Sequence, residues 1–174
     1  MSRVLVAGLG NIFLGDDGFG VQVAQQLLQT DTPDGVVVRD IGIRGIHLAY
    51  ELLDEFDLLV LIDAVSRGGK PGTLYVIEHR QAGRQGEQTG AMLDAHDLNP
   101  DQVLATVAQL GGTLCRTVVV GCEPEQAGPG MGLSATVRRS VDDAVRVVLD
   151  VVATAQSKPT GELPGRVPVG RSNQ

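Results

Sequence analysis

Short apolar runs alternate with helical patterns along most of this chain. Apolar positions that recur every three or four residues predict helices over residues 20–29, 46–55, 101–110 and 133–153. Apolar runs of strand length predict strands at residues 4–7, 36–39, 58–62, 73–77 and 117–120. This alternation is typical of an α/β fold in which helices cover both faces of one sheet.

The fourth predicted strand differs from the others in its connection. Only nine residues, 64–72, separate it from the third strand, and they are rich in Gly and include Pro71. A crossover between parallel strands needs about a dozen residues or more. We therefore expect a mostly parallel, twisted sheet of five strands, in which residues 73–77 form one antiparallel strand.

The segment between the first strand and the first helix begins like a nucleotide-binding loop and ends in two acids. Gly8 and Gly10 match the start of a dinucleotide fingerprint, but Phe13 stands where the third glycine belongs. Asp16 and Asp17 would repel a phosphate at the helix N-terminus, where an anion needs free backbone N–H groups. One of the two aspartates could cap the helix. The other needs a different role.

Further chemistry-bearing side chains fall where predicted strands end. Asp16 and Asp17 follow the first strand, Asp40 ends the second, Asp63 ends the third, and His96 precedes the helix at 101–110. Ligands of open α/β sheets gather at the carboxyl ends of the strands. Two carboxylates and one imidazole there would form an open site for a borderline divalent metal such as nickel or zinc. Asp63 could instead bind loop N–H groups, and a loop histidine needs no special task.

Charge and hydropathy exclude several classes of partner. The chain carries a net charge of −7 and has a pI near 4.8, whereas nucleic acids and anionic membranes select basic surfaces. No apolar stretch approaches the roughly 20 residues that span a bilayer. We expect a protein that works in the cytoplasm and binds neither nucleic acid nor membrane.

The chain is long enough for one domain with a full core, because it has 174 residues and 43% of them are hydrophobic. Apolar periodicity stops near residue 156, and proline alternates with glycine from there to the end. We expect a single domain over residues 1–155 and a disordered tail over 156–174.

Three motifs, in order along the chain, resemble one known family. They are Gly8-x-Gly10-Asn11 with Asp16-Asp17-Gly18-x-Gly20, then Leu61-Ile62-Asp63-Ala64, then His96-Asp97-Leu98. With them the chain resembles the hydrogenase maturation endopeptidases, from about residue 3 to about residue 153. The resemblance implies a five-stranded, three-layer α/β/α sandwich. It also implies a protease that removes a short C-terminal extension from the large-subunit precursor of a nickel-iron hydrogenase after nickel insertion.

The family's metal contacts correspond here to Asp17, Asp63 and His96. The resemblance implies that the nickel arrives with the precursor. A monomer would suit an enzyme that must dock on a much larger protein. The metal would then orient or polarise the scissile amide. Alternatively, nickel only reports that the substrate is ready, and Asp16 or Asp40 acts as general base on water.

Two other functions compete with the protease. A non-catalytic, nickel-sensing chaperone would bind the same precursor through the same three residues. A Rossmann-like small-molecule binder would need phosphate affinity, which Phe13 and the paired aspartates disfavour.

The turn after the second strand departs from the family pattern. Members often carry an Asp-Gly-Gly-Thr-like turn there; Asp40 and Gly42 match it, whereas Ile41 and Arg44 do not. We hypothesise that Arg44 meets an acidic feature of the partner's extension.

Overall fold

The computed structural model describes residues 2–79 and 100–157. Its strands are β1 (Val4–Leu9), β2 (Val36–Gly42), β3 (Leu58–Ala64), β4 (Leu74–His79) and β5 (Arg116–Cys122). Its helices are the short 3-10 helix η1 (Gly15–Gly18), α1 (Phe19–Leu27), α2 (Gly45–Glu51), α3 (Pro100–Gln109), α4 (Ala135–Arg138) and α5 (Val141–Ser157).

The strands form one five-stranded sheet in the order β2-β1-β3-β5-β4. β1 pairs in parallel with β2 and β3, β3 pairs in parallel with β5, and β4 runs antiparallel to β5. The predicted sheet with one antiparallel strand is therefore confirmed. Because the chain moves from β1 to β2 on one side and then to β3 on the other, the sheet has its topological switch point at the ends of β1 and β3.

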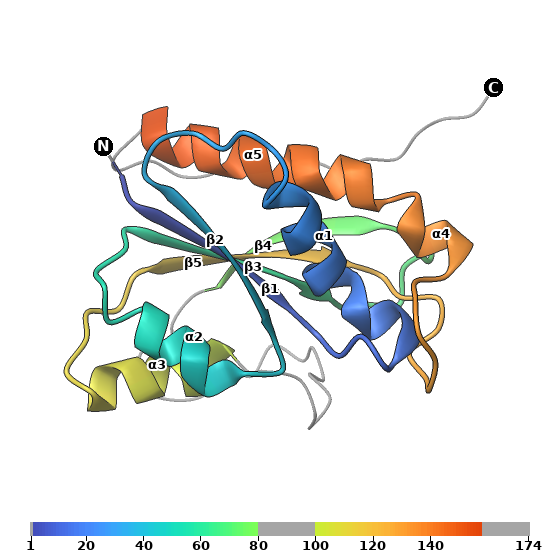
Figure 1. The fold of residues 1–174 in the computed structure, drawn as a ribbon, viewed down its shortest axis with the longest axis horizontal. Helices are drawn as coiled ribbons and strands as arrows, with labels where there is room; N and C mark the ends of the chain where they lie inside the picture. The colour runs from blue at the N-terminus through green and yellow to red at the C-terminus, as the bar shows by residue number, and fades with distance from the viewer. Residues whose placement is uncertain (1, 80–99, 158–174) are drawn as a thin grey trace.

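Helices cover the sheet on both faces, so the predicted three-layer sandwich is also confirmed. Figure 1 shows α1 and α5 on one face and α2 and α3 on the other. Within β1, Val4 and Val6 belong to the core under α1 and α5, whereas Leu5 and Ala7 belong to the core under α2 and α3. This two-residue alternation explains why the central strands are apolar on every side chain.

Gly8 and Gly20 let α1 approach the sheet closely. A Cβ at Gly8 would lie 2.2 Å from the carbonyl oxygen of Gly20, and one at Gly20 would lie 2.0 Å from that of Ile62. Neither position can hold a side chain without moving backbone. These two glycines of the fingerprint-like segment thus serve helix packing.

The C-terminal helical pattern differs from its prediction. Instead of one helix over residues 133–153, the short α4 and the longer α5 meet at a turn containing Arg139 and Ser140. Ser140 Oγ donates to the carbonyl oxygen of Gly72, 2.8 Å away, so this turn is attached to the loop before β4. α5 continues to Ser157, past the predicted domain end at 155, and the rest of the predicted tail lies outside the described residues. No described helix is long and apolar enough to cross a membrane.

Candidate active site

Three of the predicted site residues lie at the end of the sheet where the parallel strands terminate, which we call the carboxyl edge. Asp40 lies on β2, Asp63 is the next-to-last residue of β3, and Asp17 lies in η1, which follows β1 and packs against β3. The register pairs Gly8 of β1 with both Asp40 and Ile62, the residue before Asp63. The fold therefore brings these carboxylates to the carboxyl ends of three adjacent strands, as the sequence predicted.

Asp17 is half-buried and tied to the loop that precedes it. Its Oδ2 accepts a hydrogen bond from the backbone N–H of Asn11 at 2.8 Å. Gly10 makes this geometry accessible: it has φ +128°, and a Cβ there would lie 1.8 Å from the carbonyl oxygen of Asp17. Only glycine fits so close to the backbone of the aspartate. The loop thereby fixes the orientation of one carboxylate oxygen.

Asp63 is buried, with 7% of its surface exposed. Its Oδ1 accepts from the N–H of Ala64 at 2.8 Å. A carboxylate at the end of an apolar strand is costly unless hydrogen bonds or a cation compensate for its burial. The local bond to Ala64 is the kind of loop contact that the sequence left open, and it leaves a role in metal recognition open as well.

Asp40 is half-buried at the end of β2, where its Oδ2 accepts from Gln25 Nε2 of α1 at 3.2 Å. The exposed Arg44 closes the turn that follows. Its guanidinium donates to the carbonyl oxygens of Asp40 and Ile41, at 2.9 and 3.2 Å. The Arg44 side chain therefore bonds to the backbone of its own turn. Its hypothesised contact with a partner stays a prediction.

Asp16 lies in a different environment from its neighbour, because its side chain is fully buried. Its Oδ2 accepts from the N–H groups of Glu125 and Gln126, at 2.9 and 2.8 Å, and from Ser134 Oγ at 2.9 Å. Its Oδ1 accepts from the N–H of Ser134 at 2.7 Å. Asp16 therefore anchors the segment that follows β5.

Burial alone would raise the pKa of Asp16, but the hydrogen bonds from Gln126, Ser134 and Glu125 outweigh it and hold the pKa below its ordinary value. Such a carboxylate stays ionised, has its oxygens engaged and is screened from water. Neither role that the sequence offered for Asp16, helix cap or general base, matches this arrangement. Of the two predicted base candidates, Asp40 is the one with partial exposure.

The loop after β1 and the segment after β5 form one bonded unit. The N–H of Gly15 donates to the carbonyl of Gly130 at 2.9 Å, and the N–H of Gly130 donates to the carbonyl of Phe13 at 2.9 Å. The N–H of Asp16 adds a bond to the carbonyl of Gln126 at 2.8 Å. The position of η1, and with it that of Asp17, is therefore set by residues 124–134.

Glu123, which the sequence analysis did not select, is a third buried acid at this end of the sheet, besides Asp16 and Asp63. It follows β5 and accepts from the N–H groups of Arg67 and Gly68, at 2.8 and 3.3 Å, and from the hydroxyl of Tyr75 at 2.8 Å. Burial raises its pKa, but these bonds, that of Arg67 first, bring it below its ordinary value. Its position after an apolar strand, like that of Asp63, is the signal that could have revealed it.

The third predicted metal contact, His96, lies outside the described residues. Within the described ranges, 2–79 and 100–157, no group of three or more His, Cys, Asp or Glu side chains could hold a metal ion. The predicted trio needs His96 as its third member, so this observation does not test it. His79, on β4, has another partner, since its Nε2 lies 2.9 Å from Asp101 Oδ1.

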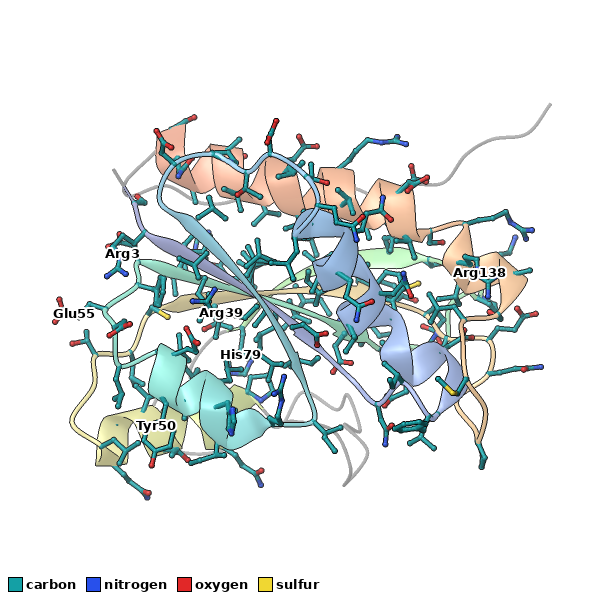
Figure 2. The ribbon with its side chains drawn as sticks, viewed as in Figure 1. Arg3, Arg39, Tyr50, Glu55, His79 and Arg138 are labelled. Atoms are coloured by element: carbon teal, nitrogen blue, oxygen red, sulfur yellow. The ribbon has the colours of Figure 1, made fainter. Side chains whose placement is uncertain are left out.

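The site occupies the end of the molecule opposite the chain's N-terminus. Figure 2 shows Arg3 and Glu55 at the end where β1 begins and Arg138 at the other end. Arg138 donates to the carbonyl oxygen of Leu133 at 3.0 Å and thus lies beside the segment that holds Asp16. The carboxyl edge is therefore built from the loops after β1, β2, β3 and β5.

Comparisons with known proteins show the family to which this chain is similar. The family model described as hydrogenase maturation protease matches residues 21–151, a range that includes Asp40, Asp63 and His96. Hydrogenase 2 maturation protease of Escherichia coli is 30% identical over 152 residues, which cover 84% of this chain and 88% of that protein. Hydrogenase expression/formation protein HupD of Rhizobium leguminosarum is 31% identical over 169 residues, covering 91% of this chain and 80% of that one.

Solved structures show the same fold. The hydrogenase maturating endopeptidase HybD of E. coli superposes with a TM-score of 0.72 and 28% identity, over 88% of this chain and 93% of that one. Another E. coli endopeptidase gives a TM-score of 0.71 and 31% identity, over 89% and 93%. The chain therefore belongs to the hydrogenase maturation protease family, as its motifs indicated, and is a peptidase.

Proposed function

We propose that this peptidase removes the C-terminal extension from the large-subunit precursor of a nickel-iron hydrogenase after nickel insertion. One observation carries the proposal. The 3-10 helix η1, which contains Asp17, packs against β3, and Asp63 lies near the C-terminal end of β3, at the switch point of the sheet. Open α/β sheets bind their ligands at this point. Family membership supplies the reaction class, and the names of the relatives supply the kind of substrate.

In this proposal nickel is part of the substrate, and Asp17, Asp63 and His96 recognise it. Oxygen and imidazole donors suit a borderline divalent ion. The backbone N–H of Asn11 holds Oδ2 of Asp17, so we assign Oδ1 to the nickel. Three donors do not fill the coordination sphere of nickel. The ligands that the precursor supplies can therefore stay bound to the metal while the protease recognises it.

Hydrolysis adds water to the scissile carbonyl carbon, breaks the C–N bond and transfers a proton to the departing amine. Asp40 is the group we assign to removing the proton from water, because it is half-buried and its Oδ2 is oriented by Gln25. The nickel either orients or polarises the scissile amide, or only reports that the substrate is ready. In both cases the carboxylates act from fixed strand ends.

The decisive test mixes the protein with nickel-loaded and nickel-free precursor and follows the precursor's mass. The proposal expects truncation of the loaded form only, lost in Asp63→Asn. Asp142→Asn is a matched control, since Asp142 lies on α5 and bonds Gln26 instead. Intact nickel-loaded precursor that nevertheless binds the protein would establish the chaperone in place of the protease.

The assignment of Asp40 has its own test. General-base catalysis contributes roughly 10²- to 10⁴-fold, so Asp40→Asn should lower kcat by about that factor while leaving KM within about twofold. Cleavage of the nickel-loaded precursor at a series of concentrations separates the two constants. An unchanged kcat would remove Asp40 from the mechanism.

We further propose that the protein acts as a monomer in the cytoplasm. The acidic charge of −7 supports a protein that avoids anionic surfaces. Sedimentation of the purified protein tests the oligomeric state, and fractionation of the producing cells tests the compartment.

A further inference from the structure

Large apolar side chains are exposed around the carboxyl edge of the sheet. They are Ile12, Phe13, Ile43, Ile46 and Met131, which we call the apolar rim, and their exposed fractions run from 41% for Ile12 to 74% for Met131. Single exposed apolar residues are ordinary, but several gathered around one site mark a surface that contacts another molecule.

Four of the rim residues come from three loops that backbone hydrogen bonds join, and Ile46 lies in the first turn of α2. Phe13 and Met131 lie on segments linked by the hydrogen bond from the N–H of Gly130 to the carbonyl of Phe13, 2.9 Å long. The loop of Ile43 is linked to the same unit by the N–H of Gly10, which donates to the carbonyl of Gly42 at 3.1 Å. Rigid loops lose little conformational freedom on binding, so such a surface is prepared for a partner.

Two of the rim residues lie close in the chain to residues of the acidic site. Ile12 follows Asn11, which holds the Asp17 carboxylate, and Ile43 lies three residues after Asp40. Among the residues that the structure describes, Asp17 and Asp40 accept their side-chain hydrogen bonds from a backbone N–H and an amide, not from a cation. The surface is thus apolar at its border and carries the carboxylates of Asp17 and Asp40 at its centre, while the exposed Arg44 places its charge on the carbonyl oxygens of the turn after β2.

This charge pattern selects the occupant. A second copy of the chain docked face to face would bring the same carboxylates against one another, which like charges oppose. A complementary partner presents apolar side chains around a positive centre. A nickel-bearing segment of a folded protein has this chemistry.

We infer that the apolar rim is the docking surface for the nickel-bearing large-subunit precursor, with Phe13 and Met131 as its main contacts. The inference rests on the proposed function and extends it, because it assigns affinity for the protein substrate to residues outside the metal-recognising trio. The rim sets binding and leaves the chemical step unchanged. Phe13 and Met131 are chosen because their exposed fractions, 62% and 74%, leave the most surface to bury.

The test replaces Phe13→Ser and Met131→Ser, singly and together. Leu28→Ser is the matched control: Leu28 is 56% exposed and lies at the end of α1, outside the rim. Because these side chains are exposed, thermal unfolding of each variant should match the wild type. With nickel-loaded precursor, each rim substitution should raise KM about tenfold with kcat unchanged, and the control should change neither constant.

Equilibrium binding to nickel-free precursor, followed by calorimetry, separates this inference from the proposed function. The rim variants should bind about tenfold more weakly than the wild type and the Leu28→Ser control, even if no preparation is cleaved. Equal affinity of rim variants, control and wild type would overturn the docking surface while leaving the protease proposal intact. Loss of a homodimer in the rim variants would also overturn it, in favour of self-association.

Discussion

Asp16 and Asp17 follow one another in the same 3-10 turn, yet one lies inside the protein and the other at its working edge. Asp16 accepts hydrogen bonds from Glu125, Gln126 and Ser134, more than 100 residues further along the chain. Asp17 accepts one bond from its own loop and stays partly exposed. In a 3-10 helix successive residues point about 120° apart, so neighbouring acids can serve different regions. The buried acid fixes the turn, and the turn presents the other.

A related division of roles occurs across the sheet at Glu123 and Asp63, although both of these side chains are buried. Glu123 uses its carboxylate to hold Arg67, Gly68 and Tyr75, so the loop after β3 is attached to the end of β5. Asp63 lies at the start of that loop. On both β1 and β3, then, an acid proposed to meet nickel is accompanied by a buried acid that organises the adjoining loop. Substitutions of Asp16 or Glu123 should therefore lower stability, whereas substitutions of Asp17 or Asp63 should lower cleavage.

The largest expected effect on folding is that of Asp16→Ala. It leaves three backbone N–H groups without their acceptor, and the free energy of unfolding should fall by about 3–5 kcal/mol. Asp17→Ala, which removes the acceptor of one partly exposed N–H, should cost about 1 kcal/mol. Urea unfolding followed by circular dichroism measures both. Equal losses in the two variants would break the distinction between the two acids.

A smaller loss is expected on the other side of the sheet. Glu123→Gln should lower the free energy of unfolding by about 2–3 kcal/mol, because the amide cannot accept all the bonds that the carboxylate accepts. Tyr75→Phe removes only the hydroxyl bond and should cost about 1 kcal/mol. If the loop after β3 positions Asp63, the Glu123→Gln variant will also cleave more slowly under conditions in which it is fully folded.

The acid side of the pH profile gives a milder test. The folded-state pKa of Asp16 lies below its ordinary value of 3.8, so its contribution to stability is present above that value. The contribution is lost as the pH falls through the folded-state pKa. The difference in unfolding free energy between wild type and Asp16→Asn should therefore be constant above about pH 5 and shrink below it. A difference that grows on acidification would contradict the ionised, hydrogen-bonded Asp16.

The smallest expected effect is that of Asp17→Glu. Glutamate keeps the carboxylate and adds one methylene to a side chain that is only half-buried. Stability should stay within about 0.5 kcal/mol of the wild type. Cleavage of nickel-loaded precursor should stay within about tenfold, and a larger loss would show that the distance from η1 to the metal is tightly set.

Local sequence patterns were sufficient to predict the sheet, but they did not predict which of the acidic residues near the strand ends are buried and hold loops in place. The apolar runs around Val6 and Val60 show their strands directly because both faces are buried. The nine-residue connection revealed the antiparallel strand because chain length limits crossovers. The role of Asp16 could not be distinguished from that of Asp17, because the hydrogen-bond partners of Asp16 come from a segment distant in sequence. The position of Glu123 after an apolar strand was visible in the sequence, but its role was not, because the loop that it binds lies more than 50 residues away.

The break between α4 and α5 could not be predicted from the apolar pattern either. The apolar spacing from Val137 through Val141 to Val145 continues without interruption, and all three side chains are buried. At the break, Ser140 makes a tertiary contact with Gly72 of the loop before β4. A pattern of one segment does not contain such contacts.

The central claim is that Asp17 acts on the nickel-bearing precursor while Asp16 only holds the turn. Its most direct test is the rate at which Asp17→Asn truncates nickel-loaded precursor, measured by mass, in a preparation that unfolds like the wild type. Outer-shell partners of metals already contribute about 10- to 100-fold, so losing a direct contact should slow truncation by at least about 100-fold. Truncation by Asp17→Asn at the wild-type rate would contradict the account.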